Sequence, residues 1–285
     1  MLEEFAKSSG LDVSGAELIK FTNNAVYRLP ASQAVLRIAG SETMRGRITK
    51  VIAVAQWLES MDFPAVRLMP NVSQPLLFGD HVATVWQMVD SSGASAGGAD
   101  LGYLLRRFHS LPPPNVTLPP WQPLTGIRSR LATPSTLVDA SDLQFLQEKC
   151  DEVEFLLDET RFVLPGGPIH GDSFVGNLIS SPTAVILCDF DSTSNGPREW
   201  DLTPAAVGRV RFDYATDVHG PLADIYGFDV MAWEGFATLR QLRELQLVTS
   251  VIPVLDKNPA IVSQWRRRLN SFRSGATDVR WSTYR

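Results

Sequence analysis

Residues 168–191 read PIHGDSFVGNLISSPTAVILCDFD, the densest run of potential catalytic side chains in the chain. The second half of this run predicts a hairpin, with a strand at 177–179, a turn at 180–183 and a second strand at 184–188. Asp189 ends the second strand, and Asp172 lies in the loop before the first. We therefore expect Asp172, Asn177 and Asp189 to lie near one another.

These three side chains are the groups that phosphoryl transfer requires. A carboxylate must orient or deprotonate the attacking hydroxyl, and Asp172 suits that role. Magnesium prefers oxygen ligands and usually takes only one or two from protein, a role that suits Asn177 and Asp189. The pattern predicts a phosphotransferase that uses ATP, or another nucleoside triphosphate, together with Mg²⁺.

The same residues carry a resemblance to a known family. Asp172 and Asn177, spaced D-x-x-x-x-N, followed by Asp189-Phe190-Asp191, look like the protein-kinase-like fold in its HGD variant. That variant is typical of the aminoglycoside phosphotransferase and choline kinase family. The downstream stretch 196–202, GPREWDL, is similar to the segment that supports the catalytic loop in that family. The resemblance implies an α+β, bilobal protein-kinase-like fold, with a small antiparallel-sheet N-lobe and a mainly helical C-lobe.

The resemblance extends to the nucleotide site of the first lobe. Asn24-Ala25-Val26-Tyr27-Arg28 looks like the family's strand-turn-strand that covers the nucleotide, which implies that Asn23 and Asn24 lie over the phosphates. Gln87, Met88 and Val89 fall where the family's hinge contacts adenine, mainly through backbone groups.

Arg37 stands in the strand where kinases generally carry the phosphate-binding lysine. Its planar guanidinium can bind phosphate through two hydrogen bonds, so we expect it to hold the nucleotide. The following helix has no acidic residue between Met44 and Leu58 to pair with this cation. Glu42 is the nearest candidate partner.

Hydrophobic periodicity gives the expected organisation of the chain. The first third predicts a meander, one helix and a hairpin, in the order 18–21, 26–29, 34–38, 45–60, 75–78 and 82–89. Small and polar residues at 91–98 have the composition of a linker. We predict an N-terminal nucleotide-binding lobe over 1–90, a hinge over 91–99 and a helical C-lobe over 100–285. Its clearest helices are 100–111, 140–160, 230–251 and 258–272.

Composition and charge limit the class of protein. The chain has 285 residues, 44% of them hydrophobic, as in a folded protein with a sizeable core. A formal net charge of -5 argues against a nucleic-acid partner. Cys150 and Cys188 lack the spacing of a zinc site or a disulfide framework. No stretch has the length and apolar character of a membrane span, so we predict a cytoplasmic location. The resemblance to the aminoglycoside phosphotransferase and choline kinase family implies a small-molecule hydroxyl acceptor as the partner.

The acceptor site is less defined by sequence. Asp191 could bind a second metal, cap a turn or contact the acceptor, and Glu244 on a late helix could face the acceptor, with Glu234 and Asp213 as rivals. We expect His170 to brace the catalytic loop. Aminoglycosides, amino sugars, amino alcohols and macrolides all remain possible acceptors.

Two other functions fit parts of the sequence. Gly171-Asp172-Ser173 resembles the nucleophile motif of GDS-type hydrolases, with Asp217 and His219 as conceivable partners, although that motif normally lies near the start of a chain. A catalytically weak or inactive kinase-like nucleotide-binding protein is the stronger alternative, because Arg37 and the missing helix carboxylate are changes that such proteins show.

Overall fold

A computed structural model describes residues 2–21, 24–133 and 135–284. Contacts divide the chain into two compact units. The first comprises Met1–Ala96, Arg107–Pro119 and Phe174–Ser194, and the second comprises Gly97–Arg106, Pro120–Ser173 and Asn195–Arg285. The segment Phe174–Ser194 groups with the N-terminal residues, although it follows the predicted hinge in sequence.

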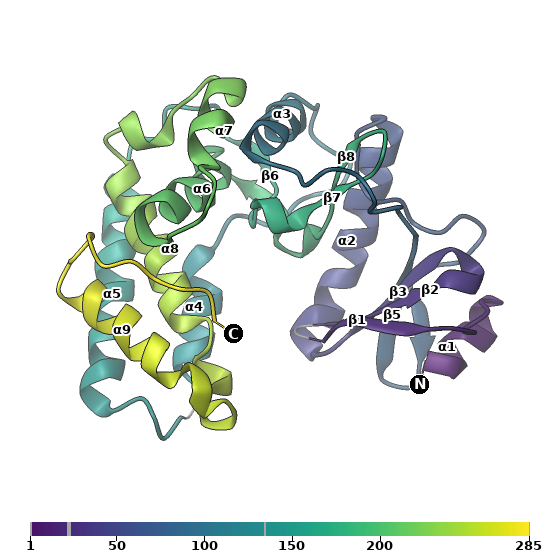
Figure 1. The fold of residues 1–285 in the computed structure, drawn as a ribbon, viewed down its shortest axis with the longest axis horizontal. Coiled ribbons are helices and arrows are strands. Elements are labelled where there is room, and N and C mark those ends of the chain that lie inside the picture. The colour runs from purple at the N-terminus through teal and green to yellow at the C-terminus, as the bar shows by residue number, and fades with distance from the viewer. Residues whose placement is uncertain (1, 22–23, 134, 285) are drawn as a thin grey trace. The chain divides into compact units, whose positions relative to one another are not determined.

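An antiparallel five-stranded sheet forms the centre of the first unit (Figure 1). Its strand order is β1-β2-β3-β5-β4, with bounds Glu17–Phe21 for β1, Asn24–Leu29 for β2, Ala34–Ala39 for β3, Leu76–Phe78 for β4 and His81–Gln87 for β5. Every predicted strand of the first third is present, and the predicted α+β class is confirmed. The central strand β3 carries Arg37, which lies opposite Val26 on one side and Thr84 on the other.

Side chains alternate across β3, as the two-residue period of a strand requires. Leu36 and Ile38 are buried against Phe5 of helix α1 (Leu2–Ser9) and against Val85 of β5. Val35 and Arg37 point to the other face of the sheet, where they line a pocket. One face of the sheet therefore forms a core, and the opposite face is left for a ligand.

Helix α2 (Glu42–Ser60) packs on the same unit. Ser41 caps its first turn, since the hydroxyl of Ser41 accepts a hydrogen bond from the backbone N–H of Met44 at 3.2 Å. Ile48 and Ile52, one turn apart, are buried beside Met44 and Ala39. The predicted helix over 45–60 is confirmed, with a start three residues earlier.

The predicted catalytic hairpin is present as β7 (Leu178–Ser180) and β8 (Val185–Leu187), which pair antiparallel. The backbone of Leu187 joins this hairpin to the segment after α2, because its N–H donates to Pro64 O at 2.9 Å and its carbonyl accepts from Val66 N at 3.0 Å. A 3-10 turn over Phe190–Ser192 follows.

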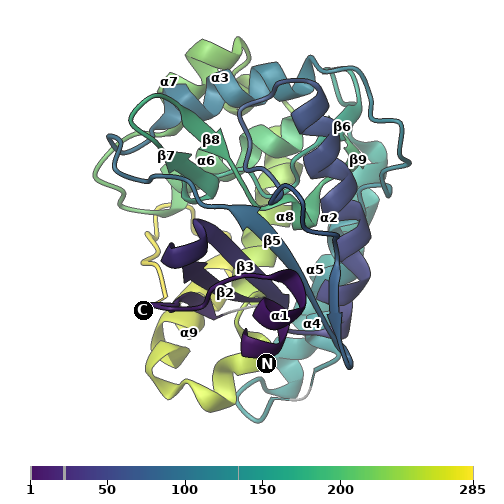
Figure 2. The same cartoon turned by 90° about the vertical axis from the view of Figure 1, so that its right-hand side faces the viewer.

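The second unit is mainly helical (Figure 1). Its helices are α3 (Gly98–His109, whose last turn belongs to the first unit), α4 (Pro123–Leu131), α5 (Ala140–Glu159), α6 (Glu199–Arg211), α7 (His219–Tyr226), α8 (Phe236–Thr249) and α9 (Val262–Arg273). Helix α8 contacts α4, α5, α6 and α9, and the core between these helices contains Leu146, Trp200, Leu242 and Trp265. Two short strands, β6 (Gly167–Ile169) and β9 (Ser194–Gly196), pair with each other as a separate two-stranded sheet (Figure 2).

The late helices begin after their predicted starts. Helix α8 starts at Phe236 rather than at residue 230, because Val230–Ala232 forms a separate 3-10 turn that Asp229 caps. Helix α9 starts at Val262 rather than at residue 258, because Pro259 opens another short 3-10 turn. Within the described residues, no helix is long and apolar enough to cross a membrane.

The Ser41 cap gives a test of how α2 is stabilised. Ser41→Ala removes the acceptor for the Met44 N–H, so we expect the free energy of unfolding to fall by about 1 kcal/mol. Denaturant unfolding measures the change. Thr43→Ala is the matched control, because the exposed Thr43 makes no side-chain hydrogen bond in the described structure; an equal loss in both variants would contradict a capping role.

Candidate functional site

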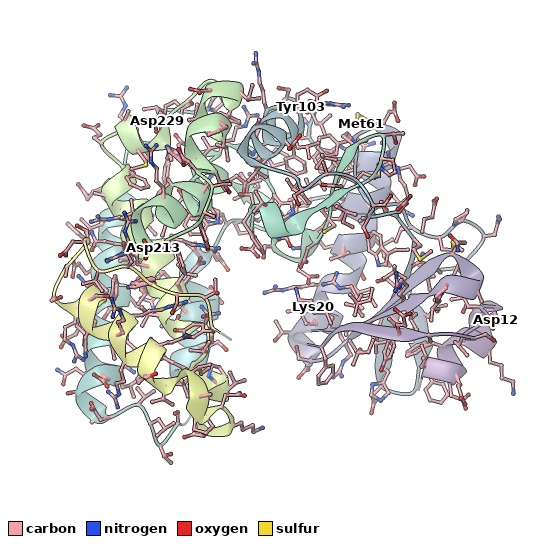
Figure 3. The ribbon with its side chains drawn as sticks, in the orientation of Figure 1. Asp12, Lys20, Met61, Tyr103, Asp213 and Asp229 are labelled. Carbon is pink, nitrogen blue, oxygen red and sulfur yellow. The ribbon has the colours of Figure 1, made fainter. Side chains whose placement is uncertain are left out.

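A pocket of about 910 Å³ lies in the first unit, on the face of the sheet opposite the Leu36 core. It collects six of the residues predicted to bind nucleotide or metal, namely Arg37, Gln87, Met88, Val89, Asn177 and Asp189. β1 contributes Glu17, Ile19 and Lys20 to the wall, and Lys20 extends outward from its strand (Figure 3). Residues that are up to about 170 positions apart in sequence thus share one cavity.

The walls at the β5 end of the pocket are apolar. Trp86 is almost fully buried, and its ring lies 6.4 Å from that of Phe190, centroid to centroid. The backbone after Trp86 is fixed on both sides, because Gln87 N donates to Arg67 O and Met88 N donates to Gln33 O, each at 2.9 Å. This end of the pocket combines apolar side chains with a fixed backbone, which suits a planar ring.

Asn177 and Asp189 are neighbours on the β7–β8 hairpin. The backbone N–H of Cys188 donates to the carbonyl of Asn177 at 2.9 Å, which places the two residues on adjacent chain segments. Asn177 is buried, with 5% of its surface exposed, whereas the Asp189 side chain is 36% exposed. Asp189 has a positive φ of 68°, a conformation that Asp tolerates better than most residues.

The donor set at this hairpin fits magnesium. It offers one carboxylate and one amide oxygen in the same pocket, which matches the one or two protein ligands that Mg²⁺ commonly takes beside phosphate and water. In the described part of the chain, no group of three or more His, Cys, Asp or Glu side chains could hold a metal ion. A cage made entirely of protein ligands is therefore not what these residues form.

Arg37 pairs with carboxylates of the turn that follows Cys188. Its Nη2 contacts Asp191 Oδ2 in an ion pair, and Asp189 Oδ1 lies 3.6 Å away. Asn24 adds to the same group, with its Nδ2 3.4 Å from Asp191 Oδ2. Glu42, the partner predicted as nearest on α2, makes no ion pair in the described structure. Asp191 thus faces Arg37, and its role toward an acceptor stays a prediction.

Lys50 of α2 is a functional candidate that the sequence analysis missed. Its Nζ donates to the backbone carbonyls of Asp191 at 2.7 Å and of Thr193 at 2.8 Å. Burial and, to a smaller extent, the nearby Arg47 lower the pKa of Lys50 to about 8, against the opposing effect of Asp191. The sequence analysis looked on α2 for a carboxylate that would pair with Arg37. The helix contributes the cation of Lys50 instead, and this cation binds the turn that follows Asp189. The sequence signal for this role was a lysine between Ile48 and Ile52, in an otherwise apolar stretch of the helix.

Among the other predicted nucleotide residues, Asn24 begins β2 and contacts Asp191 as described above. Asn23 lies outside the described residues. The thiol of Cys188 lines the pocket, and burial together with the neighbouring Asp189 raises its pKa to about 12, against the opposing effect of Lys20 and Arg37. This thiol is therefore protonated at neutral pH, which is unfavourable for nucleophilic chemistry.

The loop that carries Asp172 belongs to the second unit and is held by Asp201. The backbone N–H groups of His170 and Gly171 donate to the two carboxylate oxygens of Asp201 at 2.6 and 2.8 Å. Ser173 Oγ donates to the backbone carbonyl of Asp201, and Trp200 Nε1 donates to Gly171 O at 3.0 Å. Asp201 lies in the first turn of α6 and is fully buried, so this helix holds the loop backbone in place.

Asp172 itself is accessible, with 40% of its side chain exposed. Its Oδ1 lies 3.3 Å from Nη1 of Arg243, on α8. Ser173, by contrast, is completely buried and directed at a backbone carbonyl, and His219 Nε2 lies 2.8 Å from Asp229 Oδ1. These contacts favour Asp172 over Ser173 as the reactive group of the loop.

Glu244 lies inside the helical unit rather than at its surface. Its Oε1 accepts from Arg211 Nε at 2.7 Å and its Oε2 accepts from Arg211 Nη2 at 2.9 Å, and both side chains are almost fully buried. The rival Asp213 is 79% exposed, with Arg280 Nε 3.7 Å away (Figure 3). The geometry of Glu244 indicates a structural ion pair and gives an acceptor-binding role no support.

Comparisons with known proteins agree with this geometry. The model of the phosphotransferase enzyme family matches residues 19–245. An amicoumacin kinase solved with AMP-PNP, Ca²⁺ and amicoumacin is similar in structure, with a TM-score of 0.70 and 13% identity over 99% of this chain and 94% of the other. The choline kinase LicA from Streptococcus pneumoniae gives a TM-score of 0.67 and 15% identity, over 96% of this chain and 98% of the other.

A spectinomycin phosphotransferase in complex with ADP and spectinomycin is a third similar structure, with a TM-score of 0.59, 14% identity and 97% coverage of both chains. At these identities the likeness shows the fold, which is the predicted protein-kinase-like one. The sequence matches none of the curated proteins searched.

The Lys50 contacts predict a specific defect in nucleotide binding. Lys50→Met leaves two carbonyls of the turn without their donor, so we expect the free energy of unfolding to fall by about 2 kcal/mol and the affinity for magnesium and ATP to fall about tenfold. Titration calorimetry and denaturant unfolding measure the two effects. Arg45→Met on the same helix, where the Arg45 side chain makes no polar contact with the described residues, should leave both unchanged. If the nucleotide affinity of Lys50→Met were unchanged, Lys50 would stabilise the fold without contributing to nucleotide binding.

The Glu244–Arg211 pair predicts a defect in stability. Glu244→Ala leaves the Arg211 guanidinium buried without its carboxylate, so we expect a loss of about 3 kcal/mol in the free energy of unfolding. Glu234→Ala, at an exposed position on the same unit, should change stability little. A Glu244→Ala protein of normal stability but with a raised KM for the acceptor would restore Glu244 as an acceptor ligand.

Proposed function

Because the chain belongs to the phosphotransferase enzyme family, we propose that it transfers the terminal phosphate of ATP, with Mg²⁺, to a hydroxyl group of a small molecule. The observation that carries this proposal is the pocket of the first unit, in which Arg37, Asn177 and Asp189 converge beside the apolar end of β5. A cation, two hard oxygen donors and an apolar wall are the groups that a nucleoside triphosphate needs.

The nucleotide is held by three kinds of contact. The apolar wall beside Trp86 receives the base, and backbone groups of Gln87, Met88 and Val89 select it. Arg37 contacts the phosphates through its guanidinium, which binds oxyanions in a fixed fork. Its present partner is Asp191, so phosphate oxygens compete with that carboxylate for Arg37.

Asn177 and Asp189 are the residues that would hold the magnesium ion. When bound, Mg²⁺ would neutralise the charge that develops on the phosphate oxygens during transfer. Lys50 keeps the backbone of the turn after Asp189 in place, and Arg37 restricts the Asp189 and Asp191 side chains from the sheet. The protein thus contributes mainly positioning and electrostatic stabilisation.

Asp172 orients the acceptor hydroxyl and takes its proton. The acceptor oxygen forms a bond to the γ-phosphorus, the bond to the β–γ bridging oxygen breaks, ADP leaves, and the hydroxyl proton passes to the Asp172 carboxylate. Asp201 holds the loop at His170 and Gly171, so the carboxylate of Asp172 is presented on a fixed backbone.

Substitution of Asp172 tests the proposed transfer. Asp172→Asn keeps the shape of the side chain but removes the proton acceptor, so we expect turnover to fall by about two to four orders of magnitude while nucleotide affinity stays nearly constant. The measurement is ATP consumption with magnesium across aminoglycosides, amino sugars, amino alcohols and sugar acids, followed by detection of the phosphorylated acceptor.

Two further variants complete this experiment. Asp189→Ala, which removes a proposed metal ligand, serves as the blank, and Ser173→Ala should retain most of the activity. Turnover that survives in Asp172→Asn but disappears in Ser173→Ala would overturn the assignment. Nucleotide that binds to the wild-type protein without transfer to any acceptor would favour the alternative of a kinase-like nucleotide-binding protein.

A further inference from the structure

The environment of Asp172 within the second unit carries information about the acceptor. Arg243 places one edge of its guanidinium against the carboxylate, because Nη1 lies 3.3 Å from Asp172 Oδ1 and 3.1 Å from Gln246 Oε1. The Arg243 side chain is only 16% exposed, so its position on α8 is restricted. A fixed cation therefore stands beside the group that receives the acceptor hydroxyl.

The other edge of this guanidinium is open. Both hydrogen bonds of Arg243 in the described structure use Nη1, which leaves Nε and Nη2 without a protein partner. Nε and Nη2 form the edge that binds a carboxylate or phosphate through two parallel hydrogen bonds. Arg243 is thus equipped to hold an anionic group close to Asp172.

Neighbouring charges on α8 reinforce this preference. Arg240 lies three positions before Arg243, on the same side of the helix, and its Nε lies 3.7 Å from Glu244 Oε1. Glu244, the residue after Arg243, also accepts hydrogen bonds from Arg211 through both oxygens. A cationic acceptor would therefore meet the guanidinium of Arg243, while Glu244, the acidic residue of α8, is already paired.

The aromatic side chain of Tyr214 interacts electrostatically with Arg243. Tyr214 stacks on Phe212, with ring centroids 5.1 Å apart and planes at 2°, and its residue surface is 52% exposed. Burial raises the pKa of Tyr214, while Arg268 and Arg243 act in the opposite direction, which shows that Arg243 lies within electrostatic range of the phenol. The ring adds an apolar surface and a hydroxyl to the surroundings of Arg243.

From this arrangement we propose that the acceptor carries a carboxylate or another anionic group near the hydroxyl that is phosphorylated, and that Arg243 binds this group through its Nε and Nη2. The inference rests on the proposed phosphotransferase function and narrows its acceptor to hydroxy acids and acidic sugars. Polycationic acceptors are disfavoured, because they would place an ammonium group against Arg243.

A series of acceptors that differ only in charge tests this inference. Glucuronate, glucose and glucosamine are titrated into the full chain in the presence of magnesium and a non-hydrolysable ATP analogue, and phosphate transfer to each is measured separately with ATP. We expect glucuronate to bind about tenfold more tightly than glucosamine, with glucose between them, because a charge-assisted pair at Arg243 favours the acid and repels the amine.

Variants of Arg243 assign the preference to this side chain. Arg243→Gln should reduce the preference for glucuronate over glucosamine to less than about twofold, and Arg243→Lys, which keeps the charge but loses the fork, should retain part of it. Arg209→Gln is the matched control, since Arg209 is a 54% exposed arginine of the same unit that pairs with Asp217. It should keep the wild-type preference.

The outcomes separate this inference from the proposed function. Transfer that favours glucosamine would support the phosphotransferase and overturn the anionic acceptor. Equal binding of the acid and the amine, absence of binding by both, or an unchanged preference in Arg243→Gln would also overturn it. Tight, Arg243-dependent binding of glucuronate without transfer would support the anionic site while contradicting the proposed function.

Discussion

The turn over residues 189–193 is held by positive charge from two sides, and the pocket of the first unit depends on that arrangement. Arg37 reaches it from the middle of the sheet and pairs with the carboxylate of Asp191, while Lys50 reaches it from α2 and binds the carbonyls of Asp191 and Thr193. Arg37 of β3 thus restricts the Asp191 side chain, and Lys50 of α2 restricts the backbone of the turn. Asp189, with its positive φ, is thus presented to the pocket from a turn with little freedom.

The second unit uses a buried carboxylate in a comparable way. Asp201 accepts hydrogen bonds from two successive N–H groups of the Asp172 loop, and a buried carboxylate is stable only when it is satisfied in this manner. The backbone of the Asp172 loop is thus held in place, while the Asp172 side chain stays partly exposed. Arg243 then determines the charge that surrounds it.

Sequence reasoning singled out candidate residues that lie within one stretch of the chain, and it missed a contact between residues that are distant in sequence. Asp172, Asn177 and Asp189 lie within one short motif, and the pattern of a loop and hairpin between them is recognisable from turn and strand preferences. Lys50 contacts a carbonyl 141 positions away, and backbone carbonyls have no sequence signal. Glu244 was placed in the acceptor site because charge alone does not reveal burial, and its partner Arg211 lies on another helix. Similarly, the strands were predicted well, whereas α8 and α9 start late because 3-10 turns precede them.

The cation on α2 also limits how this protein can change during evolution. Kinases generally pair a strand lysine with a helix carboxylate, but here the corresponding layer carries Arg37 and Lys50 opposite two aspartates. A single change of Lys50 to glutamate would place a third carboxylate beside Asp189 and Asp191 and would remove the donor of two carbonyls. A lineage could reach the usual arrangement only by altering several of these positions together. The Arg37, Lys50 and Asp191 set should therefore be inherited as a unit, and its joint presence in other chains would mark common descent better than any one of these residues.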